Sequence, residues 1–358
     1  MLVYLGNLLE LNQGLYNPYV RCFMAFFVSL VVSLLCGGRL IDFLHRHQSK
    51  GQPIREDGPQ SHLLTKKGTP TMGGFLILGA AILAMLLCCN LANIFVWVGI
   101  GVLLIYGAVG FVDDYLKVTK QTSNAMTAKM KLLLQFSTAL AAILLITWQT
   151  PEEYKFILNF PYTSGWSLNL GWFYVPFAMI VIAGASNGVN LSDGLDGLAA
   201  GLLSFAFVVF MIAAYLAGTA LALSYYVPAI PLAAEAAVMC AAVIGACLGF
   251  LWFNAKPASV FMGDTGSLAL GAFLGVIAVM LKQEILLAIA GGVFVMESIS
   301  VMIQVGWFKY TGGKRFFKMA PIHHHFEQLG WAETKVVYRF WLIGIVLAVL
   351  ALASFIAK

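Results

Sequence analysis

The sequence predicts an all-α polytopic integral membrane protein with about ten transmembrane helices. Hydrophobic residues make up 61% of the 358 positions and charged residues only 10%. A soluble domain carries roughly a quarter of its residues as charged groups, so a chain this poor in charge is typical of a membrane protein. Two further observations support this class: the apolar runs have the length of membrane spans, and the polar motifs fall on one side of the predicted topology.

Apolar runs of roughly 17 to 25 residues, the length that a helix needs to cross a bilayer, follow one another along the chain. No internal repeat separates them, so we expect one transmembrane domain over residues 1–358 and find no support for an inverted-repeat transporter. The expected spans lie near residues 19–37, 72–89, 95–112, 130–148, 170–186, 197–217, 236–253, 264–281, 285–306 and 336–356.

Lysine and arginine are distributed unevenly over the connections between these spans. Seventeen lie after odd-numbered spans or on their flanks, and four lie on the other side. The positive-inside rule therefore places both termini in the periplasm. We interpret the basic residues behind the net charge of +5 as topology signals and as contacts with anionic lipid headgroups. Nucleic acid is therefore not expected as a partner. The predicted cytoplasmic loops lie near 38–71, 113–129, 187–196, 254–263 and 307–335, and they contain the polar motifs.

Asp113 and Asp114 close the third expected span, four and three residues before Lys117. In a helix, Asp113 and Lys117 share a face, whereas Asp114 is rotated by about 100°. Adjacent carboxylates repel each other unless a cation lies between them, and Mg²⁺ takes oxygen ligands and bridges to substrate phosphates. The pair therefore suits a magnesium site, although a membrane-edge pair balanced by Lys117 and Lys120 would need no function.

Polar side chains recur at every third position before the sixth span, at Asn187, Asn190, Asp193 and Asp196. Successive members are rotated by about −60° on a regular helix, so the four cannot share one face. Three neighbouring glycines favour a loop whose backbone lies close to a ligand. Amides and carboxylates in such a loop suit a nucleobase, ribose or sugar, which is more than a helix cap at Ser192 or Asp193 requires.

Asp264 begins the eighth expected span, between Gly263 and Gly266. A helix N-terminus offers unpaired N–H groups and partial positive charge to an anion. The acid is therefore either a simple N-cap or part of a site that a metal-bound phosphate approaches closely at the flanking glycines. Asn254 and Lys256 precede it on the same predicted cytoplasmic loop.

An internal triple histidine, His323, His324 and His325, lies in the last predicted cytoplasmic loop. Consecutive side chains diverge in a helix and alternate in an extended chain, so the three cannot all ligate one metal. We expect hydrogen bonds to a phosphate or a sugar. Without the aspartates, a solvated polar loop would be the simpler interpretation.

Two smaller features add candidates. Lys66 and Thr71 precede the second span in a segment that lacks the order of a P-loop; it offers a cation and a hydroxyl to phosphates, or anchors the loop by its charge. Glu297 lies inside the ninth span. An intramembrane acid is a functional candidate by default, and the alternative is a carboxyl hydrogen-bonded to a neighbouring helix.

These segments together resemble a known family. In order, TKKGTPTMGG, GFVDDYLK, NGVNLSDGLDGLA, LGFLWFNAKPASVFMGDTGSLALG and MAPIHHHFE are similar to segments of the bacterial phospho-N-acetylmuramoyl-pentapeptide transferases, over essentially the whole chain. The aspartate motifs also look like the wider superfamily of polyprenyl-phosphate hexosamine-1-phosphate transferases, and PIHHHFE narrows the resemblance. Ser192 and Thr265, beside the acids, look like small departures.

The resemblance implies a Mg²⁺-dependent, homodimeric enzyme of the bacterial inner membrane, active at the cytoplasmic face. Phospho-N-acetylmuramoyl-pentapeptide would pass from UDP-N-acetylmuramoyl-pentapeptide to undecaprenyl phosphate in the lipid bilayer. The products would be lipid I and UMP, in the first membrane step of peptidoglycan synthesis.

By resemblance, Asp264 would hold Mg²⁺ with Asp113 or Asp114 assisting. A phosphate monoester is mostly dianionic at neutral pH, so we expect Asp113 to act as a metal or positioning group rather than a general base; an aspartyl-phosphate route stays open. The phosphates are assigned to Lys66, Lys117 and Lys129, the nucleotide and sugar to Asn190, Asp193, Asp196 and Asn254, and the phospho-sugar to His323 and His324. Thr71, Asn187, Glu297 and His325 complete the expected substrate-binding set.

Three alternatives compete with this hypothesis. A UDP-N-acetylglucosamine:undecaprenyl-phosphate N-acetylglucosamine-1-phosphate transferase would share most motifs, and the triple histidine argues against it. An ion-coupled transporter predicts acids near mid-span and polar groups on both faces, whereas here only Glu297 is clearly intramembrane. A non-catalytic scaffold requires none of the acids.

Overall fold

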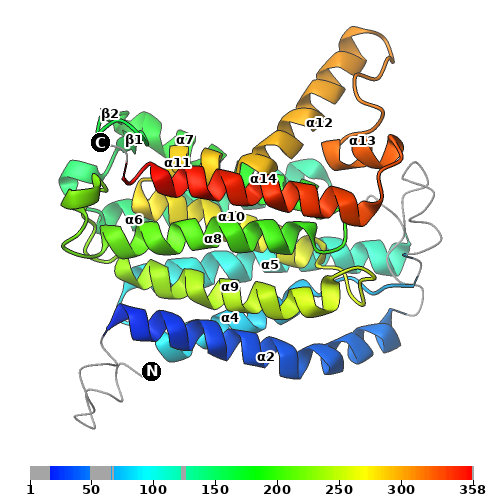
Figure 1. Cartoon of the computed structure of the whole chain (residues 1–358), viewed down its shortest axis with the longest axis horizontal. Coiled ribbons are helices and arrows are strands. Elements are labelled where there is room, and N and C mark those ends of the chain that lie inside the picture. The colour runs from blue at the N-terminus through cyan, green and yellow to red at the C-terminus, as the bar shows by residue number, and fades with distance from the viewer. Residues whose placement is uncertain (1–16, 49–65, 67, 122–125, 357–358) are drawn as a thin grey trace.

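The computed structural model describes residues 17–48, 66, 68–121 and 126–356, and this part of the chain is mostly helical (Figure 1). The predicted all-α polytopic class is confirmed. The α-helices are α2 (Pro18–His47), α4 (Gly74–Cys88), α5 (Ile94–Lys120), α6 (Ala128–Gln149), α7 (Tyr174–Ser192), α8 (Leu198–Ala217), α9 (Ala234–Asn254), α10 (Gly263–Leu281), α11 (Glu284–Ala290), α12 (Gly292–Tyr310), α13 (Ile322–Gln328) and α14 (Glu333–Ala353). Short 3₁₀ turns are η2 (Glu152–Tyr154), η3 (Gly171–Phe173) and η4 (Leu223–Tyr225).

Among the described residues, eight helices are long and apolar enough to cross a membrane, and α11 with α12 adds a ninth if the pair is one span. The second expected span is α4, a shorter apolar helix of 15 residues. The ninth expected span, 285–306, corresponds to α11 and α12, which are bent by 84° relative to each other. The break falls at Gly291 and Gly292, and glycine weakens a helix because it gains backbone freedom on unfolding. Figure 1 shows α12 leaving the bundle.

Helix α10 lies in the middle of the bundle and contacts α4, α5, α7 and α8. Every residue of α10 other than Asp264 is buried. Gly271 and Gly275 let α7 approach closely, since a Cβ at Gly271 would lie 2.5 Å from the carbonyl oxygen of Ala185. Membrane helices commonly associate through small residues in this way. Lipid tails are as apolar as the helix surfaces, so close packing rather than the hydrophobic effect stabilises the pair. The N-terminus of α10 therefore holds Asp264 centrally, at one end of the bundle.

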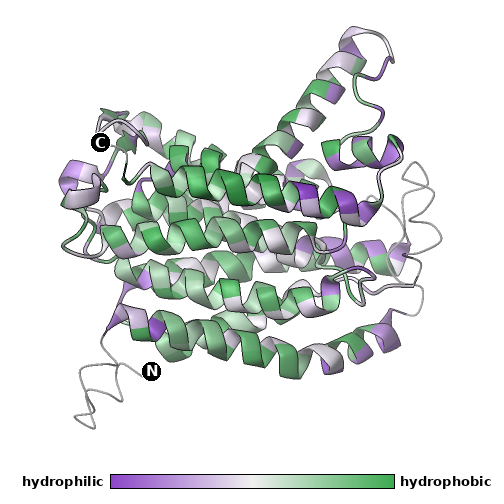
Figure 2. Cartoon of the chain, in the orientation of Figure 1, coloured by the Kyte–Doolittle hydropathy of each residue, from purple (hydrophilic) through white to green (hydrophobic). Residues whose placement is uncertain are grey.

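The two ends of the bundle differ. Strands β1 (Ile157–Asn159) and β2 (Ser167–Asn169) form an antiparallel hairpin in which Ile157 pairs with Asn169. In Figure 1 this hairpin lies at the same end as the start of α2 and the end of α14, opposite α13. Figure 2 shows apolar residues along the middle of the bundle and polar residues gathered at both ends. The chain termini, residues 1–16 and 357–358, lie outside the described residues.

Several helices extend into segments that were expected to be loops. The prediction of a loop over 187–196 is wrong for its first part, because α7 continues to Ser192. Asn187 and Asn190 both bond to neighbouring helices, so tertiary contacts override the low helix propensity of asparagine. In the same way α2 extends to His47, α5 to Lys120 and α12 to Tyr310, and α13 occupies part of the last expected loop.

Candidate active site

The three acids of the site meet because α5 passes α10 at very short range. A Cβ at Gly110 would lie 2.1 Å from the backbone carbonyl oxygen of Asp264, so only glycine permits this approach. One turn further along α5, Asp113 and Asp114 therefore lie beside the N-terminus of α10. The sequence predicted this convergence from topology, and the structure places the three acids at one end of the bundle.

Asp114 closes the N-terminus of α10 from outside the helix. Its carboxylate accepts hydrogen bonds from the backbone N–H groups of Asp264 (3.1 Å) and Thr265 (3.0 Å) and from the Thr265 hydroxyl (2.8 Å). The side chain is 0% exposed. A helix begins with unsatisfied N–H groups and partial positive charge, both of which a carboxylate stabilises. Both oxygens of Asp114 are thus engaged by the protein.

Asp113 and Asp264 are linked by two lysines, and we call these four residues the acid–lysine cluster. Lys117, on α5, lies 2.7 Å from Asp113 Oδ2 and 3.1 Å from Asp264 Oδ2. Lys131, on α6, lies 3.0 Å and 2.7 Å from the same two oxygens. The predicted i, i+4 pairing of Asp113 with Lys117 is confirmed. Two negative and two positive charges balance, so removing any one leaves a poorly solvated charge unpaired.

Asn190 holds Asp264 from the side of α7. Its amide donates to Asp264 Oδ1 at 2.8 Å and to Ser267 Oγ at 2.9 Å. Asn187, one turn earlier, donates instead to Gln135 Oε1 on α6 at 2.9 Å. The two amides therefore point to different helices, as their rotation on the helix requires. Asn190 therefore contacts the acid–lysine cluster through Asp264, whereas Asn187 supports α6.

Asp193 forms the C-cap of α7, just beyond the helix. Burial raises the pKa of its carboxyl well above the usual range, and the nearby negative charges of Asp264 and Asp114 add to this effect. The Asp193 carboxyl is therefore more readily protonated than the carboxyl of a free aspartate.

A second charged group, the Glu333 cluster, comprises Lys66, Asp196, Lys256 and Glu333. Lys66 Nζ lies 2.8 Å from Asp196 Oδ1 and 2.7 Å from Glu333 Oε1, and Lys256 pairs with Glu333 Oε2. Burial alone lowers the pKa of the Lys66 ammonium, but the carboxylates of Glu333 and Asp196 outweigh it and hold the pKa above its ordinary value. Asn254 adjoins this cluster and accepts from the backbone N–H of Gly197 at 3.0 Å.

The three histidines diverge from α13, as predicted. His323 is fully buried, with Nδ1 3.1 Å from Glu297 Oε2 on α12. His324 Nδ1 lies 2.7 Å from Glu327 Oε2, and His325 Nδ1 accepts from the backbone N–H of Lys318 at 3.1 Å. His323 also lies against the turn that follows α7, since a Cβ at Gly194 would be 2.4 Å from His323 Nε2. His323 thus packs between α12 and the turn after α7.

Two predicted residues stand apart from these contacts. Lys129 lies in the first turn of α6 and is exposed, and it is Lys131 that reaches the acids. Thr71 is fully buried, and its hydroxyl has no hydrogen-bond partner among the described residues. The Thr71 hydroxyl and Asp114 Oδ2 both lie close to Gly263, since a Cβ there would be 2.6 Å and 2.5 Å from them.

Three residues that complete the site were not among those predicted from the sequence: Lys131, Gln135 and Glu333. Lys131 counted only toward the charge bias, although a lysine inside an expected span was a usable signal. Gln135, 0% exposed on the same helix, is another polar residue inside that span. Glu333 precedes the last expected span and has no neighbouring motif. Its partners are distant in sequence, so no local pattern could have indicated them.

The donors near Asp264 suit a metal whose remaining ligands come from a substrate. Within the described residues, no three His, Cys, Asp or Glu side chains are placed to hold an ion by themselves. Mg²⁺ commonly binds through one or two carboxylates together with phosphates and water. Asp113 Oδ2 and Asp264 Oδ2 each lie within 3.1 Å of both Lys117 Nζ and Lys131 Nζ, so the two oxygens are close enough together to contact one cation. The acid–lysine cluster therefore fits Mg²⁺ by donor type.

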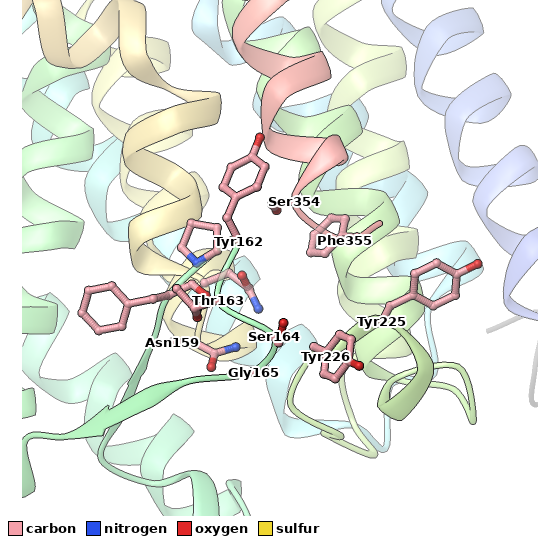
Figure 3. Close-up of a pocket in the computed structure, with 12 residues that line it drawn as sticks. Asn159, Tyr162, Thr163, Ser164, Gly165, Tyr225, Tyr226, Ser354 and Phe355 are labelled. Atoms are coloured by element: carbon pink, nitrogen blue, oxygen red, sulfur yellow. Dashed lines mark hydrogen bonds between the residues drawn. The ribbon is translucent and has the colours of Figure 1, made fainter. Parts of the chain in front are cut away.

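A separate small pocket lies at the opposite end of the bundle (Figure 3). Its walls come from the β-hairpin, the turn after η4, Gln283 and the end of α14. None of the candidate site residues lines it. The pocket is therefore distinct from the candidate active site.

Asp114→Asn is expected to destabilise the fold as well as the site. The substituted amide would place an N–H₂ group against the donors at the start of α10, and an unsatisfied buried donor costs about 1–3 kcal/mol. The midpoint of thermal unfolding in detergent should fall, whereas Asp42→Asn, at an exposed position in α2, should leave it unchanged. An unchanged midpoint for Asp114→Asn would contradict the capping role.

The fold and the site define a polytopic membrane transferase of glycosyl transferase family 4, whose family model matches residues 96–282, from α5 to the end of α10. Residues 66–78 match phospho-N-acetylmuramoyl-pentapeptide-transferase signature 1. Two relatives named phospho-N-acetylmuramoyl-pentapeptide-transferase, from Rickettsia felis and Rickettsia canadensis, are each 49% identical over 335 residues, which is 93% of this chain and 92% of the relative. The chain belongs to the phospho-N-acetylmuramoyl-pentapeptide-transferase family.

Proposed function

We propose that this chain transfers phospho-N-acetylmuramoyl-pentapeptide from UDP-N-acetylmuramoyl-pentapeptide to undecaprenyl phosphate, which yields lipid I and UMP. The family membership at 49% identity carries this proposal. It favours the muramoyl-pentapeptide substrate over UDP-N-acetylglucosamine. Clustering of the polar motifs at one end of the bundle also argues against a transporter, which would expose polar groups along a path through the membrane.

The site faces the cytoplasm of a bacterial inner membrane in this proposal, and both termini face the periplasm. The excess of lysine and arginine in the connections at the site end supports this orientation. A water-soluble nucleotide then reaches the acids from the cytoplasm, while the lipid acceptor arrives within the bilayer. By family resemblance, the enzyme acts as a homodimer.

Mg²⁺ is assigned to Asp264 with Asp113, whose oxygens face the same two ammonium groups. Asp114 was expected as an alternative to Asp113 in assisting Asp264, but its oxygens are engaged at the start of α10, so we assign it a positioning role. When bound, the ion supplies positive charge that offsets the repulsion between two phosphate groups. The attacking phosphate is mostly dianionic at neutral pH, so no side chain needs to remove a proton from it.

The lysines of the acid–lysine cluster are assigned to the phosphates. In the reaction, an oxygen of undecaprenyl phosphate bonds to the sugar-linked phosphorus of the donor, and the bond to the UMP phosphate breaks. Charge accumulates on both sides of this phosphorus, and catalysis of such a transfer is largely positioning and electrostatic stabilisation. Lys117 and Lys131 lie nearest the acids, so Lys131 takes the role that the sequence suggested for Lys129.

The remaining residues are assigned to the nucleotide and the sugar. Asn190 orients Asp264, and Asp193, Asp196 and Asn254 surround the turn after α7, where a nucleoside would find several polar groups. His324 is partly exposed and suits the phospho-sugar, whereas the buried His323 is held between Glu297 and that turn. Thr71, Asn187 and His325 support the surrounding backbone and helices.

Transfer of labelled phospho-muramoyl-pentapeptide to undecaprenyl phosphate in detergent tests the proposal. We expect lipid I formation that stops when Mg²⁺ is chelated and resumes when it is added back. UDP-N-acetylglucosamine should neither serve as donor nor compete at equal concentration. Transfer from UDP-N-acetylglucosamine, with none from the muramoyl-pentapeptide donor, would reject the proposed substrate.

A further inference from the structure

We propose that Glu333 is a positioning residue that assembles the nucleotide-binding part of the site. This inference rests on the proposed function, since it assigns Glu333 to the donor nucleotide. Glu333 belongs to none of the sequence motifs and lies in the first turn of α14. In sequence it is far from the turn after α7, to which it bonds.

Glu333 uses both carboxylate oxygens to join separate segments. Oε1 accepts from Lys66 Nζ at 2.7 Å and from the backbone N–H of Asp196 at 2.9 Å, while Oε2 pairs with Lys256. The Glu333 side chain is 3% exposed. Charge-assisted hydrogen bonds in such a poorly solvated place are strong and directional. Glu333 therefore fixes one lysine before α4, one lysine after α9 and the turn after α7 relative to each other.

The turn held by Glu333 is also bonded to the segment between α9 and α10. Asp196 Oδ2 accepts from the backbone N–H of Ala258 at 3.2 Å, and the backbone N–H of Gly197 donates to Asn254 Oδ1 at 3.0 Å. Gly197 has φ = +81°, a conformation that favours glycine. Glu333 therefore fixes the turn that contains Asp196 and that bonds to Asn254, because it accepts from the backbone N–H of Asp196. Both of these residues are assigned to the nucleotide.

The charges of this cluster show why Glu333 acts through its neighbours. Lys66 Nζ lies within 2.7–3.4 Å of Glu333 Oε1, Asp196 Oδ1 and the Gly194 carbonyl oxygen. An ammonium has three N–H donors, so these protein oxygens can use all of them. Two lysines and two acids also balance in charge. The Glu333 cluster is thus an ordered frame in which Glu333 acts through Lys66, Lys256 and the turn after α7.

Glu333→Gln tests this role through nucleotide binding, with UMP as the probe. The amide keeps the size of the side chain but loses the charge that holds two ammonium groups, so the dissociation constant for UMP should rise about tenfold or more. The KM for UDP-N-acetylmuramoyl-pentapeptide should rise in parallel, while kcat and the KM for undecaprenyl phosphate stay within about twofold. Glu333→Asp, which keeps the charge on a shorter arm, should recover part of the affinity.

The matched control is Glu152→Gln, which removes an exposed acid paired with Lys155 at the opposite end and should leave all four constants unchanged. In a Lys66→Met background, Glu333→Gln should cost less UMP affinity than it does in the wild type, because the two residues act through one contact. A Glu333→Gln variant with normal UMP affinity, or one that loses kcat at unchanged KM, would overturn the inference.

The UMP measurement also separates this inference from the proposed function. UMP binding does not require group transfer, so a wild-type protein that binds UMP yet makes no lipid I would reject the function while the effect of Glu333→Gln could still be measured. Normal lipid I formation together with unaltered UMP binding in Glu333→Gln would reject the role of Glu333 alone.

Discussion

Asp264→Asn should lower lipid I formation by about 10³-fold, the loss expected when a charged group is removed from an electrostatically stabilised transition state. Asp264 pairs with both Lys117 and Lys131 and also accepts a hydrogen bond from Asn190. Asparagine keeps the shape but supplies no negative charge for a metal. The loss should appear in kcat and should not be restored by raising the Mg²⁺ concentration a hundredfold. Initial rates of transfer in detergent at several metal concentrations measure it.

Two controls make the Asp264→Asn result specific. Asp42→Asn changes an exposed acid on α2 and should retain full activity. UMP affinity should change by less than about threefold in Asp264→Asn, because the nucleotide is assigned to residues around the Glu333 cluster. If Asp264→Asn retained more than about a tenth of the wild-type rate, the metal would have to be held chiefly by Asp113.

The architecture was largely predictable because membrane helices leave strong local signals. Each expected span coincides with a helix or a helix pair, since only long apolar helices satisfy their backbone hydrogen bonds in lipid. The bend between α11 and α12 was not predicted. Gly291 and Gly292 lie within an apolar run, where glycine is common in membrane helices and does not by itself indicate a break.

The acids of the site were predictable, but their partners were not. Asp113, Asp114 and Asp264 stand out because carboxylates are rare near hydrocarbon. Their different roles follow from neighbours that are distant in sequence: Thr265 engages Asp114, whereas Lys131 lies between the other two acids. Such pairings depend on how α5, α6 and α10 pack, and no local sequence pattern predicts them.

Glu333 illustrates the same limit more strongly. Its nearest partners come from residues before α4, from the turn after α7 and from the segment after α9. An acid at the start of an expected helix is the common arrangement that complements the helix dipole, so its sequence position suggested no special role. Only the assembled bundle places this carboxylate between two lysines.

Lys131→Met should reduce transfer by about 10²-fold, whereas Lys129→Met should stay within about twofold of the wild type. The two lysines are two residues apart on α6, so their side chains point to different sides of the helix at a similar depth in the membrane. Lys131 lies 2.7 Å from Asp264 and 3.0 Å from Asp113, whereas Lys129 is exposed. Methionine keeps a long unbranched side chain and removes the ammonium group, with its charge and its N–H donors. Matched rates of lipid I formation for the two variants measure the difference.

The reason for this contrast is electrostatic. Without Lys131, two carboxylates share the single ammonium of Lys117, and loss of a charge-assisted bond in a partly buried site costs about 1.5–3 kcal/mol. Mg²⁺ can offset that excess negative charge, so the apparent affinity for the metal should rise in Lys131→Met while kcat falls. A structural lysine would instead lower thermal stability and leave the metal dependence unchanged. Equal losses for both variants would contradict the assignment of Lys131 to the phosphates.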